Sequence, residues 1–461
     1  MTKIKINKLI IACVGIGMAS ILTMSLIQMR PEPEQRQPEP IEEKQGRFYE
    51  QTHFIIDIIE QTHPIFKMAD KLNQAEYITV REEFIKNGTA VENERDFFFE
   101  LLHYIKVLQD GHMVANNMWW MNNSTIAEQM HVTEQGVFLV DTQGNHAGKV
   151  ISIAEIEIEK ILETIAEYIY FENEIDKGVW LQKMVGKQLI HERIIGHKLE
   201  TQIEIIVEVD GQIEIRESEY MIIRDEPYRY NTGAKMNHQR LAGDIFYMDI
   251  PVFTNEVAFK EMEIEVVHAI EEGIKKFIID LRDNPGGNSG LGTDLLAAMG
   301  ISMSGASVKR RVSELFLEEK ISHYFGNPKS EEALNFIEEI RTLYFDELWV
   351  SSSGELNGTN ENDLQIVILM NNNTYSSAQM IANMVQDTGV GLLVGEPSRE
   401  APSSFGDMMY VRVPKTDWQL ALSSSWFGRT DERADSMLLM PDVLVPSEQA
   451  LEVAIDYLLN K

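Results

Sequence analysis

Residues 367–389 read VILMNNNTYSSAQMIANMVQDTG, a short apolar run followed by three asparagines and a helical pattern. The apolar run predicts a buried strand, and the apolar residues after Ser377 recur at helical spacing. Ser376 and Ser377 therefore stand where a strand turns into a helix. Serines at this point commonly cap the first helical turn. Such a corner can also expose a hydroxyl nucleophile at the positive end of the helix dipole. Both interpretations stay open on this stretch alone.

The sequence after Gly243 places this corner in an α/β unit. The stretches DIFYMDIPVF, KFIIDLR and LQIVILM read as strands, with helical patterns between them. This alternation predicts a largely parallel sheet, in which sites form at the carboxyl ends of strands. One such end carries Gly286 and Gly287, which can present backbone N–H groups to an oxyanion. A plain turn is the alternative interpretation of the two glycines.

Composition excludes several classes of function. The 461 residues carry a net charge of −32, which argues against nucleic acid as a partner. Cys13 is the single cysteine, so an intramolecular disulfide and a cysteine-based zinc site are excluded. A chain of this length is too long for one hydrophobic core and predicts two to four domains.

The N-terminus predicts a membrane anchor. Three lysines in MTKIKINK precede the uncharged apolar stretch 9–29, whose 29 − 9 + 1 = 21 residues are enough to span a bilayer as a helix. Without a clear small-residue cleavage site, an uncleaved anchor is favoured over a cleaved signal. The lysines should remain cytoplasmic, which predicts a single-pass protein of the cell membrane with an extracytoplasmic remainder. Residues 30–46, rich in proline and glutamate, predict an extended linker.

Three further regions follow the linker. Residues 47–116 read as a helical module, with apolar residues at helical spacing around Phe48–Met68 and again around Glu92–Leu108, as in Phe98, Leu101 and Ile105. Residues 117–241 are mixed, with a predicted helix over about 156–170 and a β-hairpin turning at Asp210–Gly211. Residues 242–461 form the predicted α/β core.

A hydroxyl nucleophile needs a base, and the base usually needs an orienting acid. His112 differs from the other histidines because it lies in the loop QDGHMV that ends a predicted helix. His63 and His103 look structural. Acidic residues gather before the final helix: Asp431, Glu432, Asp435 and Asp442. By composition alone these acidic side chains are solvated charges.

Three motifs give these pieces a common context. FIIDLRDNPGG, NNNTYSSAQMIANMVQDTGVGLLVGEPS and MPDVLVP resemble, in order and spacing, the core motifs of the C-terminal-processing (tail-specific) peptidase family. The early region ending at LQDGHM is similar to the helical region of the tricorn-core branch. The resemblance implies a crotonase-like core of βαβ units and often a PDZ-like module, here a degenerate one in the middle region. It implies no cofactor and no metal.

The resemblance also assigns roles. It makes Ser376 the nucleophile, with an oxyanion hole from the N–H groups of Ser377 and of Gly286 or Gly287. The processing branch would place a lysine base near Ala401, and no lysine occurs between Ser376 and Lys415. The tricorn-core branch instead implies His112 as the base. Its acid matches Asp435, six residues before Pro441, where the branch has glutamate.

The sequence therefore predicts a membrane-anchored, extracytoplasmic serine peptidase that cleaves peptides or proteins through an acyl-enzyme. The alternative is an inactive family member that binds peptides or apolar ligands in the same cleft. The expected partners are a peptide or protein substrate and, through the N-terminal helix, the membrane.

Overall fold

The computed structural model describes residues 41–116, 124–222, 235–305, 307–320, 329–352, 355–429 and 437–460. The predicted anchor at 9–29 lies outside these residues. Among the helices that the structure does describe, none combines the length and apolar character that a bilayer crossing requires. The first described helix begins at Ile41, so the last residues of the predicted linker are helical.

A helical module follows, as predicted. It contains α2 (Ile41–Thr62), the 3₁₀ turn η2 (Pro64–Lys67), α3 (Gln74–Ala90) and α4 (Glu94–Lys106). Helix α3 was not predicted from sequence, because most of its residues are polar. Asn93 caps α4 by accepting a hydrogen bond from the Asp96 N–H. The buried Trp418 indole stacks on the Phe97 ring at 5.2 Å between centroids, which joins this module to a turn more than 300 residues away.

The middle region combines helices with antiparallel strands. Within the described residues its seven strands have the order β2-β8-β7-β5-β4-β3, with β6 beside β5. The hairpin of β7 and β8 turns at Asp210–Gly211, as predicted, and both turn residues have positive φ. The elements are β2 (Ser124–Ile126), β3 (Met130–Thr133), β4 (Gly136–Val140), β5 (His146–Ile153), β6 (Ile156–Glu157), α5 (Ile158–Tyr168), α6 (Glu174–Met184), α7 (Gln188–Ile195), β7 (Gln202–Val209) and β8 (Gln212–Ile222).

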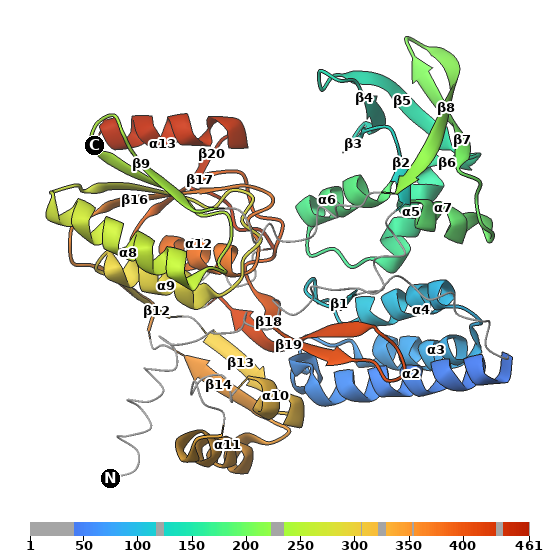
Figure 1. Ribbon diagram of the computed structural model, residues 1–461, viewed down its shortest axis with the longest axis horizontal. Coiled ribbons are helices and arrows are strands. Elements are labelled where there is room, and N and C mark those ends of the chain that lie inside the picture. The colour runs from blue at the N-terminus through green and yellow to red at the C-terminus, as the bar shows by residue number, and fades with distance from the viewer. Residues whose placement is uncertain are drawn as a thin grey trace.

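The predicted α/β unit is present. Its sheet, as far as the chain is described, has the order β20-β17-β16-β11-β10-β9, and all neighbours are parallel except β9 with β10. Helices α8, α9 and α12 cover one face and α13 the other (Figure 1). The bounds are β9 (Asn237–Leu241), β10 (Ile245–Asp249), α8 (Glu256–Glu271), β11 (Lys276–Asp280), α9 (Ser289–Ala298), β16 (Gln365–Met370), α12 (Ser377–Thr388), β17 (Leu392–Gly395), β20 (Val443–Leu444), η5 (Ser447–Gln449) and α13 (Ala450–Leu459).

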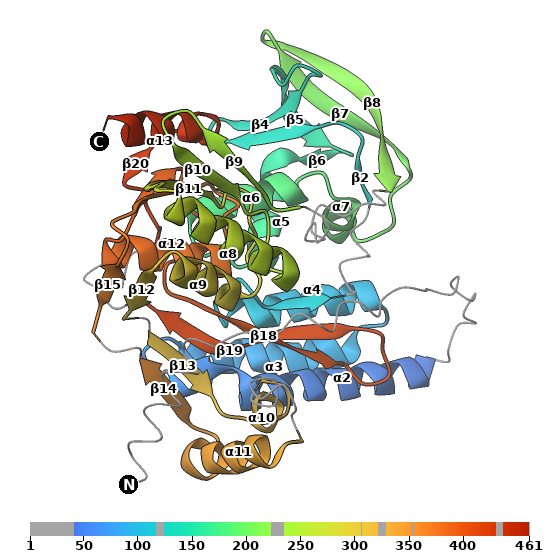
Figure 2. The same ribbon diagram turned by 60° about the vertical axis from the view of Figure 1, so that its left-hand side comes forward.

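The region 242–461 also builds a second sheet that the sequence did not predict. Strands β18 and β19 form an antiparallel hairpin, and β19 also pairs with β13 and with β1. Figure 2 shows this sheet lying between the α/β unit and the N-terminal helices. Its elements and their neighbours are β1 (Val114–Asn116), β12 (Ile301–Ser304), β13 (Ser307–Arg311), α10 (Glu314–Glu319), α11 (Glu331–Tyr344), β14 (Leu348–Ser352), β15 (Asn357–Asn360), β18 (Ser404–Arg412) and β19 (Gln419–Gly428).

Pairing of β1 with β19 decides where the N-terminal module meets the α/β unit. Val114 lies opposite Ala421 in this antiparallel pair. The loop that carries His112 ends directly at β1, so the register of the second sheet fixes where this loop lies.

Candidate active site

Ser376 occupies a strained corner between β16 and α12. Its backbone has φ 54° and ψ −123°, a conformation that side-chain-bearing residues rarely adopt. Such a backbone costs on the order of 1–3 kcal/mol and persists only where the surroundings hold it. The Ser376 N–H donates to the Glu400 carboxylate, and the Tyr375 N–H donates to the Asn284 carbonyl oxygen at 2.9 Å. These contacts hold the corner from both sides.

Neither serine uses its hydroxyl as a helix cap. Ser376 makes no capping hydrogen bond, and its hydroxyl has no hydrogen-bond partner among the described residues. Ser377 instead donates from Oγ to the Gly287 carbonyl oxygen at 2.5 Å. The capping interpretation therefore does not account for the pair, and the Ser376 hydroxyl is left available for chemistry.

The glycine loop after β11 packs directly against this corner. Gly286 has φ 100°, and a Cβ built on it would lie 2.7 Å from Ser376 Cβ. The Gly286 N–H donates to Asn284 Oδ1 at 2.8 Å. The N–H groups of Gly287 and Ser377 have no acceptor within the described part of the chain. The two glycines thus differ: Gly286 gives the serine room, and Gly287 retains a backbone donor beside it.

His112 reaches the same corner from the helical module. Its ring lies 5.0 Å from the Tyr375 ring between centroids, and its Nε2 lies 3.9 Å from Glu400 Oε1. The His112 side chain is only 10% exposed. Both ring nitrogens are buried without a hydrogen bond in the described structure. A buried imidazole with unused nitrogens beside a carboxylate is a candidate base.

Glu400 links the candidate base and the candidate nucleophile. One carboxylate oxygen accepts the Ser376 N–H, and the other faces His112 and accepts from Ser404 Oγ at 2.8 Å. Burial raises the pKa of the Glu400 carboxyl, and the neighbouring His112 partly offsets this effect. Glu400 was not predicted from sequence, although it immediately precedes Ala401, near which the processing branch would place its lysine.

A second buried carboxylate comes from the middle region. Glu172 Oε1 accepts a hydrogen bond from the Tyr375 hydroxyl at 3.1 Å, and Oε2 accepts one from the Ala401 N–H at 2.6 Å. Burial raises the pKa of Glu172 well above its ordinary value, and the like charge of Glu400 adds to this shift. The middle region therefore contacts the corner directly, a feature that no local sequence signal reveals.

The loop of His112 is held by a buried pair. The His63 ring accepts the Ile65 N–H on Nδ1 at 3.2 Å, so its proton lies on Nε2, which donates to Asp110 Oδ2 at 3.0 Å. Asp110 Oδ1 accepts the His112 N–H at 2.8 Å. Burial acts to raise the pKa of Asp110, but the hydrogen bond from His63 and the other groups around the carboxylate outweigh it, and the pKa is lowered. His63 is thus structural, as predicted, and it supports the loop of the candidate base.

Of the residues predicted from sequence, the structure brings Ser376, Ser377, Gly286, Gly287 and His112 to one place. Asp435 lies outside the described residues, so its assignment stays a prediction. In the ranges that are described, no three His, Cys, Asp or Glu side chains form a group that could hold a metal ion.

Comparison with known proteins shows which proteins this chain is similar to. The model of peptidase family S41 matches residues 244–409, which contain both the glycine loop and the Ser376 corner. Mature CPAF is similar in structure, with a TM-score of 0.58, 13% sequence identity, and coverage of 90% of this chain and 96% of that one. Mature CPAF complexed with lactacystin gives a TM-score of 0.56 at 12% identity, over 90% and 97% of the two chains. No match is found among curated proteins.

The chain is accordingly a serine-type peptidase, a hydrolase with an α/β protease fold. Its segment 244–409 carries the core of peptidase family S41, which confirms the resemblance to the C-terminal-processing peptidases.

Proposed function

We propose that this protein hydrolyses peptide bonds in peptides or proteins through an acyl-enzyme on Ser376. The observation that carries the proposal is the Ser376 corner itself. A strained serine with an unbonded hydroxyl lies between two unpaired backbone N–H groups and a buried histidine–glutamate pair. A serine that only shapes a turn would not need these neighbours.

The proposed reaction starts with Ser376 Oγ attacking the substrate carbonyl carbon while His112 accepts its proton. The N–H groups of Gly287 and Ser377 stabilise the oxyanion. The C–N bond then breaks, and the proton moves from His112 to the leaving amine. Water repeats the sequence on the acyl-enzyme, with His112 taking its proton, and releases the new carboxyl terminus.

Two acids compete for the role of orienting His112. Asp435 is assigned by the tricorn-core resemblance, and Glu400 is assigned by position, because its carboxylate lies 3.9 Å from Nε2. We infer that Glu400 orients the imidazole. With the proton on Nε2 toward Glu400, the lone pair on Nδ1 accepts the serine proton.

The predictions from sequence about the core arrangement and the membrane anchor are part of this proposal. We infer a crotonase-like arrangement of the core, an uncleaved anchor at residues 9–29, and a peptidase domain that faces outside the cell membrane. Added protease should then release a soluble peptidase fragment from intact cells by cutting near the linker. Release only after the cells are permeabilised would reject this orientation.

A serine-reactive fluorophosphonate tests the central proposal. The purified protein should become labelled at Ser376, and peptide hydrolysis should stop as labelling completes. The Ser376→Ala variant should fold normally, remain unlabelled and lose on the order of 10⁶-fold in kcat. Ser377→Ala keeps its backbone N–H, so it should remain labelled. Absence of labelling in a folded wild-type protein would instead support the alternative, an inactive member that only binds peptides.

A further inference from the structure

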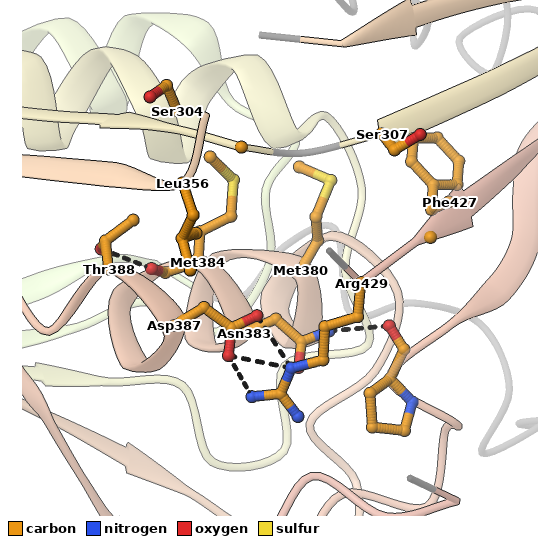
Figure 3. Close-up of a pocket in the computed structure, with 13 residues that line it drawn as sticks. Ser304, Ser307, Leu356, Met380, Asn383, Met384, Asp387, Thr388, Phe427 and Arg429 are labelled. Carbon is orange, nitrogen blue, oxygen red and sulfur yellow. Dashed lines mark hydrogen bonds and ion pairs between the residues drawn. The ribbon is translucent and has the colours of Figure 1, made fainter. Parts of the chain in front are cut away.

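Two features of the structure take no part in the proposed reaction: a pocket along α12 and a pair of histidines on the middle region. The pocket is lined by apolar side chains such as Met380, Met384 and Leu356, and by the buried ion pair of Arg429 and Asp387 (Figure 3). Because these two charges neutralise each other, the pocket presents no net charge to a ligand. The sheet of the middle region, in contrast, carries two imidazoles whose ring nitrogens face each other at the surface.

The two histidines lie on different strands of one sheet. His131 belongs to β3 and His146 is the first residue of β5, with β4 between the two strands (Figure 1). His131 Nδ1 and His146 Nε2 are 3.0 Å apart. Both residues are exposed. The fold therefore brings together two histidines that are distant along the chain and leaves the pair open to solvent.

A shift of register in the sheet turns His146 to the face of His131. Residues directly opposite each other in an antiparallel pair share a face, and a shift of one residue moves a side chain to the other face. Strands β4 and β5 pair regularly up to Leu139, so a regular ladder would place Ala147 opposite Val140. The register shifts at this point, and His146 lies opposite Val140 instead. Such bulges re-aim side chains and are frequent beside functional sites.

Phe138 supports the pair from the strand between the two histidines. It lies directly opposite His131 and two residues before Val140, so all of these side chains share one face of the sheet. The Phe138 ring stacks on the His146 imidazole with 4.3 Å between centroids and 5° between planes. This stacking fixes the plane of the imidazole, so packing sets which nitrogen faces His131.

The separation of the two nitrogens fits a shared metal ion as well as a hydrogen bond. Without an ion, one imidazole donates its N–H to the lone pair of the other. Bonds from an imidazole nitrogen to a divalent transition-metal ion are about 2.0–2.1 Å long, as for zinc, so two such ligands at a right angle lie about 2.9 Å apart. Tetrahedral ligands would lie about 3.3 Å apart. The observed 3.0 Å is closer to the right angle of tetragonal Cu²⁺ or Ni²⁺ sites.

The surroundings leave the other coordination positions of such an ion open. Asp141, which follows β4, uses its carboxylate within its own turn, where Oδ1 accepts the N–H groups of Gln143 and Asn145 at 2.8 Å each. In the ranges that the structure covers, no third His, Cys, Asp or Glu side chain completes a metal site. Water therefore occupies the remaining positions. The net charge of −32 adds a general attraction for cations.

We propose that His131 and His146 form a binding site for a divalent transition-metal ion with tetragonal geometry, Cu²⁺ being bound most tightly. The ion takes the place of the proton between the two rings, and this proton moves through solvent to the outer nitrogen of its own ring. Both imidazoles stay neutral, and the bound ion joins β3 to β5. The site uses no residue of the Ser376 corner and is independent of the proposed peptidase reaction.

Titration of the purified full chain with CuCl₂ and, separately, with NiCl₂ tests the proposal. Calorimetry should show one strong site per chain, with Cu²⁺ bound more tightly than Ni²⁺. Mg²⁺ and Ca²⁺ should not bind there, because they prefer oxygen ligands. The electron paramagnetic resonance spectrum of the Cu²⁺ complex should show splitting from two imidazole nitrogens. Absence of Cu²⁺ binding, or a copper spectrum without nitrogen ligands, would overturn the proposal.

Substitution of each histidine assigns the binding to this pair. His131→Ala and His146→Ala each remove one ligand and should weaken Cu²⁺ binding by at least about 10-fold. His238→Ala is the matched control, because His238 is also exposed and stacks on a phenylalanine, Phe246, with 5.4 Å between centroids. This control should bind Cu²⁺ as the wild type does.

Thermal unfolding separates loss of the site from loss of the fold. Without metal, the three variants should unfold at about the temperature of the wild type, because the substituted side chains are exposed. Added Ni²⁺ should raise the Tm of the wild type and of His238→Ala, but not of the other two variants, because only a bound ion stabilises the folded state. If His131→Ala and His146→Ala still bind Cu²⁺ as tightly as the wild type, the pair is only a hydrogen bond and the proposal is wrong.

Discussion

The Ser376 corner and the His112 loop meet at one carboxylate but are held in different ways. The corner is built by backbone: a strand end, a helix start and the glycine loop from the neighbouring parallel strand. The His112 loop is held by side chains, through Asp110 and His63, and borders on Glu172 from the middle region. A strained backbone anchored by the Glu400 carboxylate thus positions the nucleophile, whereas a buried polar network positions the base.

Among the changes that test how the two regions are held, the largest effect should come from Glu400, the residue that both regions share. Glu400→Gln removes the negative charge beside His112, and we expect kcat to fall on the order of 10³- to 10⁴-fold. Asp435→Asn should change kcat by less than about 10-fold if Glu400 is the orienting acid. Steady-state kinetics on both variants decide which of the two acids orients His112. A severe loss for Asp435→Asn with an active Glu400→Gln would restore the assignment made from sequence.

The pH profile sharpens the same test. Burial raises the pKa of Glu400, so its carboxyl ionises at a higher pH than an ordinary glutamate. The ionised form stabilises the imidazolium, so kcat/KM should rise with pH as Glu400 loses its proton. Glu400→Gln should lack that contribution to the rise. An unchanged profile in the variant would mean that Glu400 does not titrate in catalysis.

Breaking the corner should have the next largest effect. In Gly286→Ala the new methyl group would meet Ser376 Cβ at 2.7 Å, at a backbone φ of 100°. We expect a loss of about 10²-fold in kcat from displacement of the serine. Gly389→Ala, at the end of α12, shares a positive φ but meets nothing within 4 Å. This control should lose about 1 kcal/mol of stability and retain its kcat.

Breaking the support of the loop should have a smaller effect on rate and a larger one on folding. His63→Ala leaves the buried Asp110 carboxylate without its imidazole partner. We expect the free energy of unfolding to fall by about 3 kcal/mol and kcat to fall by about 10-fold. His103→Ala is the control in the same module, because His103 is 38% exposed and lies 3.7 Å from Glu83. Urea unfolding and kinetics should separate the two variants, and equal behaviour would contradict a supporting role.

The smallest effect concerns how stability depends on pH. Burial raises the pKa of Glu172, so the folded state binds more protons than the unfolded state above the ordinary glutamate pKa. The free energy of unfolding should therefore fall as pH rises through this window. Glu172→Gln removes the titration and should flatten the slope. Urea unfolding at several pH values measures it, and a steeper slope in the variant would contradict the shift.

Most of the α/β unit could be predicted because its signals are local. Buried parallel strands read as continuous apolar runs, and β11 and β16 appear where the sequence indicated them. The hairpin at Asp210–Gly211 is equally local. Helix α3 was missed because most of its residues are polar. The pairing of β19 with β1 and β13 was missed because no local pattern specifies the partner of a strand.

The residues of the candidate site also divide into those that a local sequence signal indicates and those that have no such signal. Ser376, Ser377 and the two glycines lie at strand ends, where a parallel sheet gathers functional groups, and could be named from sequence. His112 could be named only through the resemblance. Glu400 and Glu172 could not be named, because each is one acidic residue among 73 and only burial distinguishes it.

The sequence by itself determined the α/β unit, the strand-to-helix corner with its serines, and the glycines that leave room for that corner. These features follow from apolar periodicity and from the φ angles that glycine permits, which act over a few residues. Only the tertiary structure decided that Glu400 bridges Ser376 and His112, that Gly287 rather than Gly286 keeps an unpaired N–H, and that Glu172 reaches the corner. Burial, desolvation and hydrogen bonding between distant segments arise only when the chain is folded.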